Sequence, residues 1–96
     1  MTSVRLALSS VLHDITGAKE LELDLNQGST VKDLFDTLFE KYGADFRRRI
    51  LDPKTGDLRR FIIVIVNGRD IRHMNQMETE LKEGDEVAIL PAVAGG

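Results

Sequence analysis

Residues 30–43 read TVKDLFDTLFEKYG, and this stretch decides the fold. Thr30 is a good N-cap, and Asp33 three positions later forms a short relative of the capping box and suits the positive end of a helix. Gly43 occupies the place of a C′ residue in left-handed conformation. The large apolar residues recur at the spacing of one helix face: Val31, Leu34, Phe35, Leu38, Phe39 and Tyr42. The sequence therefore predicts an amphipathic helix that ends at Gly43.

Strand patterns lie on both sides of this helix. Apolar residues alternate with more polar ones over residues 4–9 and 20–25, the period of strands with one buried face. Thr16-Gly17-Ala18 supplies a turn between them, so the two strands are predicted to form a hairpin.

The chain after the helix continues the β pattern. Residues 44–51 suggest a short second helix, and residues 52–57 a turn. Phe61–Val66 is a β-branched strand that ends in the hairpin turn Asn67-Gly68, and residues 69–72 return as a short strand. A turn at residues 82–85 precedes a last strand over residues 86–90. The order β-β-α-β-β-β predicts an α+β domain, a mixed sheet with one main helix packed on one face.

The Asn67-Gly68 turn also predicts a register for the sheet. It pairs Val66 with Arg69, Ile65 with Asp70, Val64 with Ile71 and Ile63 with Arg72. Alternation then places these residues in the core under the helix: Ile62, Val64, Val66, Ile71, Val87 and Ile89. The open face is expected to carry an apolar patch that docks a partner, formed by Ala7, Ile63, Ile65, Ala88 and Leu90. The alternative is that residues 44–60 fold over this face and bury it.

Composition excludes several classes of site. Ninety-six residues make one domain, and the absence of cysteine removes disulfides, Cys-ligated metals and a thiol nucleophile. No apolar run approaches the length of a bilayer span, and no signal peptide is evident, so a cytoplasmic protein without a membrane partner or a metal site is expected.

Charge is unevenly distributed along the chain. The net charge is −3, yet residues 47–73 hold eight basic and three acidic residues, a balance of +5. Arg47-Arg48-Arg49 could steer an acidic partner or, as the weaker alternative, RNA. A solvated helix face is the plain alternative. Nucleic acid is not expected as a partner, because no aromatic residues interleave with the arginines.

The last seven residues are Leu90-Pro91-Ala92-Val93-Ala94-Gly95-Gly96. Pro91 cannot donate to a sheet, so we expect a globular domain over residues 1–90 and a flexible tail over residues 91–96. The Gly96 α-carboxylate would be ionised at neutral pH, and glycines without Cβ atoms fit a narrow cleft and leave the terminal carbonyl unhindered. A merely frayed end is the alternative.

Together with the strand order, this ending resembles the β-grasp fold of ubiquitin and the ubiquitin-like sulfur carriers. That family includes the small subunit of molybdopterin synthase and the thiamine-pathway sulfur carrier. The sequence is most similar to the carrier that serves an O-phosphoserine-dependent cysteine synthase. The similarity lies in the Leu-Pro-Ala-Val-Ala-Gly-Gly ending and in the segments Leu51-Asp52-Pro53 and Arg60-Phe61.

The resemblance implies a carrier and substrate of other enzymes, not an enzyme. An E1-like enzyme would adenylate Gly96, beside Gly95, with MgATP that it binds itself, and a sulfur donor would displace AMP to leave a thiocarboxylate. The chain would bind no cofactor. The sulfur-accepting enzyme would be a cysteine synthase or the molybdopterin synthase large subunit. The tail residues that partners would grip are Pro91, Ala92, Val93 and Ala94.

Three other functions stay open from the sequence. The chain could be the small subunit of molybdopterin synthase. It could be a covalent protein modifier that joins Gly96 to lysines, or a non-covalent interaction module with an inert tail.

Overall fold

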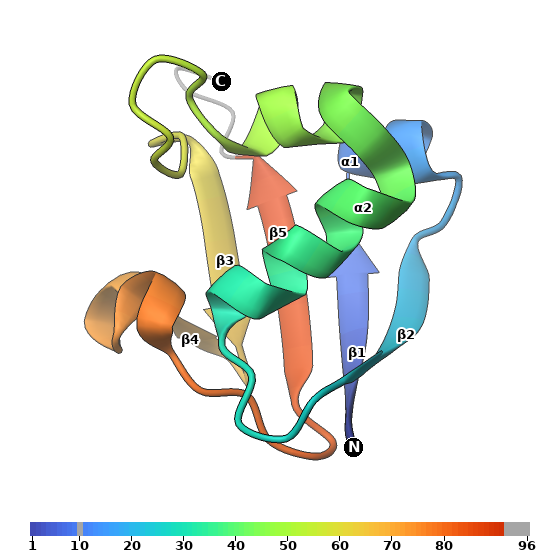
Figure 1. Cartoon of the computed structure of the whole chain (residues 1–96), viewed down its shortest axis with the longest axis vertical. Coiled ribbons are helices and arrows are strands. Elements are labelled where there is room, and N and C mark those ends of the chain that lie inside the picture. The colour runs from blue at the N-terminus through green and yellow to red at the C-terminus, as the bar shows by residue number, and fades with distance from the viewer. Residues whose placement is uncertain (10, 92–96) are drawn as a thin grey trace.

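The structure is a computed structural model of the chain, and it describes residues 1–9 and 11–91, Val11 by its backbone only. Its elements are shown in Figure 1. In chain order they are β1 Thr2–Leu8, α1 Val11–Thr16, β2 Glu20–Leu25, α2 Val31–Ile50, β3 Ile62–Val66, β4 Arg69–Asp70, the 3₁₀ helices η1 Ile71–His73 and η2 Gln76–Glu78, and β5 Glu86–Pro91.

The strands form one five-stranded mixed sheet in the order β2-β1-β5-β3-β4. β1 and β5 run parallel, and the other neighbours are antiparallel. α2 crosses one face of the sheet (Figure 1). The predicted α+β architecture is therefore confirmed.

The core lies between α2 and the sheet, and every residue predicted for it from the last strands is at most 3% exposed. Alternation in β3 buries Ile62, Val64 and Val66 and leaves Ile63 and Ile65 on the other face. α2 supplies the opposing apolar layer from both of its halves: Val31, Leu34, Phe35, Leu38, Phe46 and Ile50.

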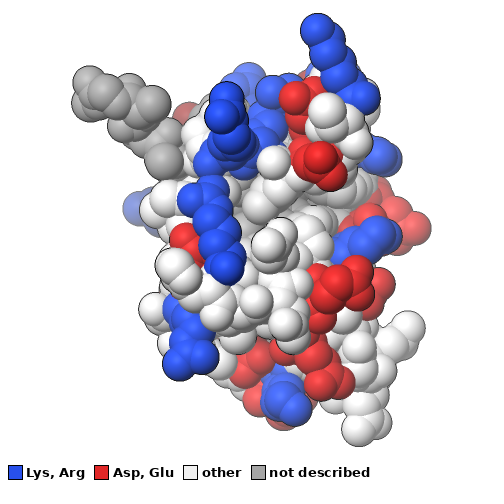
Figure 2. Space-filling view, turned by 90° about the vertical axis from the view of Figure 1, so that its left-hand side faces the viewer, with Lys and Arg blue, Asp and Glu red and all other residues white. Residues whose placement is uncertain are grey.

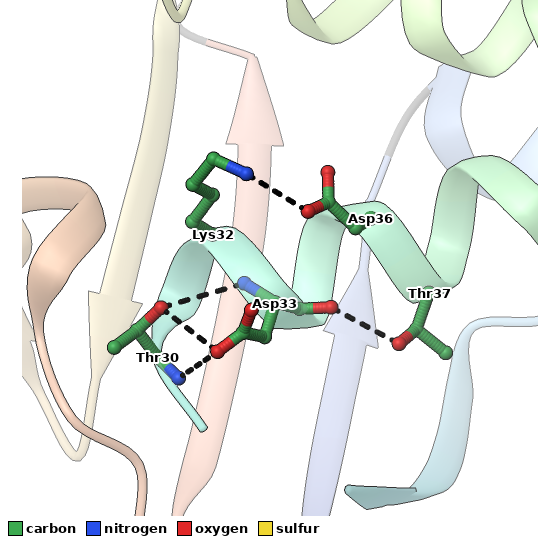
Figure 3. Close-up of polar contacts among 5 residues, drawn as sticks. All are labelled: Thr30, Lys32, Asp33, Asp36 and Thr37. Atoms are coloured by element: carbon green, nitrogen blue, oxygen red, sulfur yellow. Dashed lines mark hydrogen bonds and ion pairs between the residues drawn. The ribbon is translucent and has the colours of Figure 1, made fainter. Parts of the chain in front are cut away.

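The start of α2 follows the capping chemistry that the sequence predicts. The Thr30 hydroxyl accepts from the Asp33 N–H, and the Asp33 carboxylate accepts from the Thr30 N–H at 2.9 Å. Figure 3 shows this reciprocal pair beside Lys32, whose Nζ donates to Asp36 at 3.0 Å. That hydrogen bond, with the Asp36 charge, raises the pKa of Lys32 above its ordinary value.

Gly43 divides α2 as predicted. Its φ of 85° and ψ of −166° are non-helical, and the chain then resumes as the short helix expected after it. The break redirects the second half so that Phe46 packs against Phe39, with ring centroids 6.1 Å apart. Both halves therefore contribute to one core.

The predicted direct hairpin between the first two strands is wrong in its connection. β1 and β2 do pair antiparallel, but α1 lies between them. One helical turn lets Leu12 enter the core, where it is fully buried, and lets Ile15 pack against the core from the same side. Gly17, at φ 78°, ends the turn as its N–H donates to the His13 carbonyl at 2.8 Å.

The last hairpin is shorter than predicted. Val66 pairs with Arg69 and Ile65 with Asp70, as expected, across a turn in which Asn67 and Gly68 both have positive φ. The pairings expected for Ile71 and Arg72 are wrong, because the Asp70 carboxylate accepts from the Arg72 N–H at 2.9 Å and starts η1. Ile71 is nevertheless buried in the core.

Candidate functional site

The segment that precedes the C-terminal tail is held at the centre of the sheet. β5 is paired on both sides, with β1 over Glu86 to Ile89 and with β3 over Val87 to Pro91. It runs one residue further than the sequence predicts, since Pro91 still lies opposite Ile62. Pro91, the last described residue, is therefore held in place within the sheet.

The predicted tail residues beyond this point lie outside the described residues. These are Ala92, Val93, Ala94, Gly95 and Gly96. The structure therefore defines the base of the tail, while the reacting group assigned from the sequence stays a prediction.

The structure brings the predicted docking patch together on the open face of the sheet. Ile65 lies opposite Ala88, which in turn lies beside Ala7, and Ile63 lies opposite Leu90. All five side chains are half-buried rather than fully exposed. The patch is contiguous in register and leads along β5 toward Pro91.

Residues 44–60 do not cover this patch. Phe46 and Ile50 are fully buried in the core, and Leu58 packs against the same core. Since Ile63 and Ile65 alternate with core residues of β3, they lie on the opposite side of the sheet from these three. The alternative that this segment buries the open face is therefore not what the structure shows.

Phe61 is a candidate site residue that the sequence reasoning missed. It is 45% exposed and, apart from Met1, it is the one large apolar side chain of the described residues that is strongly exposed. The Arg59 guanidinium lies 6.0 Å from its ring centroid. The signal that could have found it is its position one residue before β3, directly after Arg59-Arg60.

A small pocket lies at the base of the tail. We call it the tail-base pocket; its volume is about 230 Å³, and it is lined by Leu12, Arg48, Arg49, Arg59, Phe61, Ile62 and Pro91. The apolar residues come from α1, from β3 with the residue before it, and from β5, and the arginines come from the end of α2 and the following loop. The pocket therefore exists only in the folded chain.

Hydrogen bonds hold the loop that carries Arg59. The Arg59 N–H donates to the Ile50 carbonyl at 2.9 Å, and its Nε donates to the Arg48 carbonyl at 2.8 Å. Leu51 and Leu58 form a β-bridge across the same loop. Arg59 is thus held beside the tail-base pocket by hydrogen bonds to backbone carbonyls.

The described residues form neither a metal-binding cluster nor a helix suited to crossing a membrane. Within residues 1–9 and 11–91, no group of three His, Asp or Glu side chains is placed to hold a metal ion. None of the described helices combines the length and the apolar character that crossing a bilayer needs.

Comparison with known proteins gives a family. The model of the ThiS family matches residues 8–96. A protein of Archaeoglobus fulgidus, provisionally named a sulfur carrier protein, is 40% identical over 77 residues, covering 80% of this chain and 84% of its own. The sulfur carrier protein CysO of Mycobacterium tuberculosis is 33% identical over 95 residues, covering 98% of this chain and 99% of its own.

Solved structures agree with the fold. CysO in the Amycolatopsis orientalis BexX/CysO complex matches with a TM-score of 0.76 and 34% identity, over 97% of this chain and 99% of that one. The small archaeal modifier protein 1 (SAMP1) of Methanosarcina acetivorans matches with a TM-score of 0.78 and 34% identity, over 100% and 98%. The expected β-grasp, ubiquitin-like fold is confirmed.

Proposed function

Because the chain belongs to the ThiS family of ubiquitin-like sulfur carriers, we propose that it carries sulfur as a thiocarboxylate on Gly96. The Gly96 carboxylate attacks the α-phosphorus of MgATP bound to an E1-like enzyme, and pyrophosphate leaves. A donor that supplies sulfur at the oxidation level of hydrosulfide then attacks the carbonyl carbon of the acyl adenylate, and AMP leaves. The product is an ionised sulfur nucleophile.

One observation carries this proposal: the family match includes the whole tail and extends to Gly96. The fold supports it, because β5 is held between β1 and β3 up to the tail. A partner can therefore recognise a rigid domain and receive the tail in a defined direction. The chain's own contribution is binding and presentation, with MgATP held by the partner.

The mass of the intact protein from its native cell tests the proposal. Wild-type protein is expected to show a fraction heavier by the difference between sulfur and oxygen, and the extra mass is expected in the C-terminal peptide. A variant that lacks Gly96 is the matched control and should show none, with unchanged thermal unfolding. Wild-type protein that stays unmodified when incubated with the adenylating enzyme, MgATP and sulfide would contradict the proposal.

For the pathway, we propose cysteine biosynthesis, which the similarity to CysO supports. The accepting enzyme would be a cysteine synthase that uses O-phosphoserine. Thiocarboxylated protein mixed with that enzyme and O-phosphoserine is expected to release phosphate and to form cysteine bonded through its sulfur to the Gly96 carbonyl, and hydrolysis of that acyl bond would then free the cysteine. The matched alternative is a mixture of the thiocarboxylated protein with the large subunit of molybdopterin synthase. Sulfur transfer in that mixture alone would replace cysteine biosynthesis as the proposed pathway.

The open face is proposed to dock the adenylating enzyme. Its five half-buried apolar residues form one contiguous surface that leads to the tail. Ile65→Asp is expected to weaken binding by at least about tenfold, since a charge would enter the centre of the contact. Ile65→Val should bind nearly as wild type, and Gln27→Asp, in an exposed loop, controls for the added charge. Equal binding by folded Ile65→Asp would remove the patch from the interface.

A covalent protein modifier is the second candidate. The likeness to small archaeal modifier protein 1 over the whole chain favours it. In that case cell extracts would contain conjugates joined through Gly96 to lysine side chains, detectable after trypsin digestion as branched peptides in which a lysine carries residues 83–96, since Lys82 is the last basic residue before the tail. The Gly96 deletion should abolish them.

A further inference from the structure

The tail-base pocket combines an apolar floor with a positive rim. Leu12, Phe61, Ile62 and Pro91 form the floor, and Arg48, Arg49 and Arg59 surround it. The floor is unlike the open-face patch, because it lies at the end of the sheet and includes the strongly exposed Phe61. It offers a place for one apolar side chain of a partner.

The rim keeps most of its positive charge. Among the described residues, neither Arg49 nor Arg59 has a carboxylate within ion-pair distance, whereas Arg48 pairs with Asp45 on the surface of the same helix. The Arg59 Nε is already bound to a backbone carbonyl, which fixes the side chain without neutralising it. A guanidinium can form paired hydrogen bonds with a carboxylate, so this rim suits acidic groups.

The surroundings extend the positive surface. A second, larger groove of about 610 Å³ shares Arg59 and adds Arg60 and Arg72, with Asp57 as the one acidic residue of its lining. Arg72 donates to the backbone carbonyls of Arg60 at 2.7 Å and Ile62 at 3.3 Å, so it too is held in place without a carboxylate partner among the described residues. In Figure 2, which views the molecule from the β3 and β4 side, Lys and Arg lie across the top and down the left half, and most Asp and Glu lie on the right side and at the bottom.

The floor and the rim together specify the chemistry of the occupant. A strand of nucleic acid needs successive stacking surfaces, and Phe61 is the single strongly exposed aromatic ring of the described part. A protein segment with one apolar side chain flanked by Asp or Glu satisfies both the floor and the rim. Continuity with Pro91 places that segment beside the point where the tail leaves the sheet.

We propose that the tail-base pocket receives an acidic segment of the adenylating enzyme, with one apolar side chain seated against Phe61 and Pro91. This inference rests on the proposed function. It adds a second contact to the open-face patch, and the two contacts lie on either side of the strand that leads to Gly96. Binding at both would fix the direction in which the tail enters the enzyme.

The charge of the rim is tested by steady-state ATP–pyrophosphate exchange. The exchange rate of the adenylating enzyme is measured as a function of the concentration of full-length carrier. Arg49→Glu is expected to raise KM for the carrier by about tenfold with kcat unchanged, because it places a like charge against the acidic segment. Arg49→Lys should restore most of the affinity. Arg69→Glu makes the same charge change on the exposed β4 turn, outside the pocket, and should change KM by less than about twofold.

The apolar floor is tested in the same assay. Phe61→Ser is expected to raise KM by about fivefold. Because Phe61 is partly exposed, the variant should keep the wild-type circular dichroism spectrum. Raising the salt concentration should raise the wild-type KM more steeply than that of Arg49→Glu, since screening acts on the charge that the variant has lost.

Three outcomes would overturn the inference. Equal KM increases for Arg49→Glu and Arg69→Glu would show a general charge effect rather than a pocket. Binding of a fluorescent oligouridylate that Arg49→Glu abolishes, with KM for exchange unchanged, would assign the rim to nucleic acid. Absence of exchange with wild-type carrier would overturn the proposed function as well as the pocket. The first two outcomes, in contrast, would overturn the pocket alone.

Discussion

The two faces of the sheet show how one strand can serve two purposes. Ile62, Val64 and Val66 of β3 are 1%, 1% and 3% exposed beneath α2, whereas Ile63 and Ile65 between them are only half-buried on the open face. The residue types are nearly the same, so the difference comes from what covers each face. The covered face stabilises the fold, and the open face keeps apolar side chains that are only half-buried.

The largest expected effect on stability comes from comparing two neighbouring isoleucines of β3 that lie on opposite faces of the sheet. Ile62→Ala is expected to lower the free energy of unfolding by about 2–5 kcal/mol, since it opens a cavity in the packed core. Ile63→Ala should cost about 1 kcal/mol, because less area is lost and no cavity forms. Urea unfolding of both variants measures the contrast. Equal losses would mean that the open face is as closely packed as the core.

A smaller effect tests how the covered face is completed after the break in α2. Gly43→Ala is expected to cost about 1–3 kcal/mol, because φ 85° with ψ −166° is a region that residues other than glycine rarely adopt. An added Cβ would meet nothing within 4 Å, so the cost would be backbone strain alone. Glu40→Ala, exposed on the same helix, is the control and should stay within about 0.5 kcal/mol of wild type. An unchanged unfolding midpoint for Gly43→Ala would contradict the assigned backbone conformation.

A third change weakens the start of the helix that covers the sheet. Thr30→Ala is expected to lower the free energy of unfolding by about 1 kcal/mol, because the Asp33 N–H loses its side-chain acceptor. Thr30→Ser keeps the hydroxyl and should behave as wild type. If the two variants unfold at the same urea concentration, the hydroxyl is not contributing as a cap.

The smallest effect is expected on the solvent side of α2. The raised pKa of Lys32 means that its pairing with Asp36 contributes below the ordinary lysine pKa of 10.5 and is lost as the pH rises beyond the folded-state value. The pair is exposed, so Lys32→Gln should leave the urea midpoint at pH 7 unchanged within error. Unfolding of both proteins at pH 7 and at pH 11 measures this. A clear loss at pH 7 would show that the solvent side of the helix also stabilises the fold.

Local patterns predicted much of the architecture. The helix boundaries at Thr30 and Gly43 follow from capping chemistry and from a conformation that glycine adopts easily, and both depend on neighbouring residues. The first two pairs after Asn67-Gly68 follow from the turn itself. The open-face residues Ile63 and Ile65 follow from strand alternation, and the structure brings them beside Ala88 and Leu90.

Other features could not be read from neighbouring residues. Helix α1 forms where Leu12 can be buried against distant strands, and a six-residue segment has little helical preference without that packing. β4 stops because the Asp70 side chain competes for the backbone of Arg72. The exposure of Phe61 depends on where the loop before β3 is anchored, through Arg59 and the end of α2.

The sequence by itself determined the helix, the alternating strands and the small, cysteine-free character of the chain, along with its Gly-Gly ending. These properties depend on residue type and short spacing. The tertiary structure alone decided that β5 lies between β1 and β3, and that α1, α2, the loop before β3 and Pro91 together form the tail-base pocket. The physical reason is that burial and strand pairing between distant segments are settled by the whole core, so no local pattern specifies which surface surrounds the start of the tail.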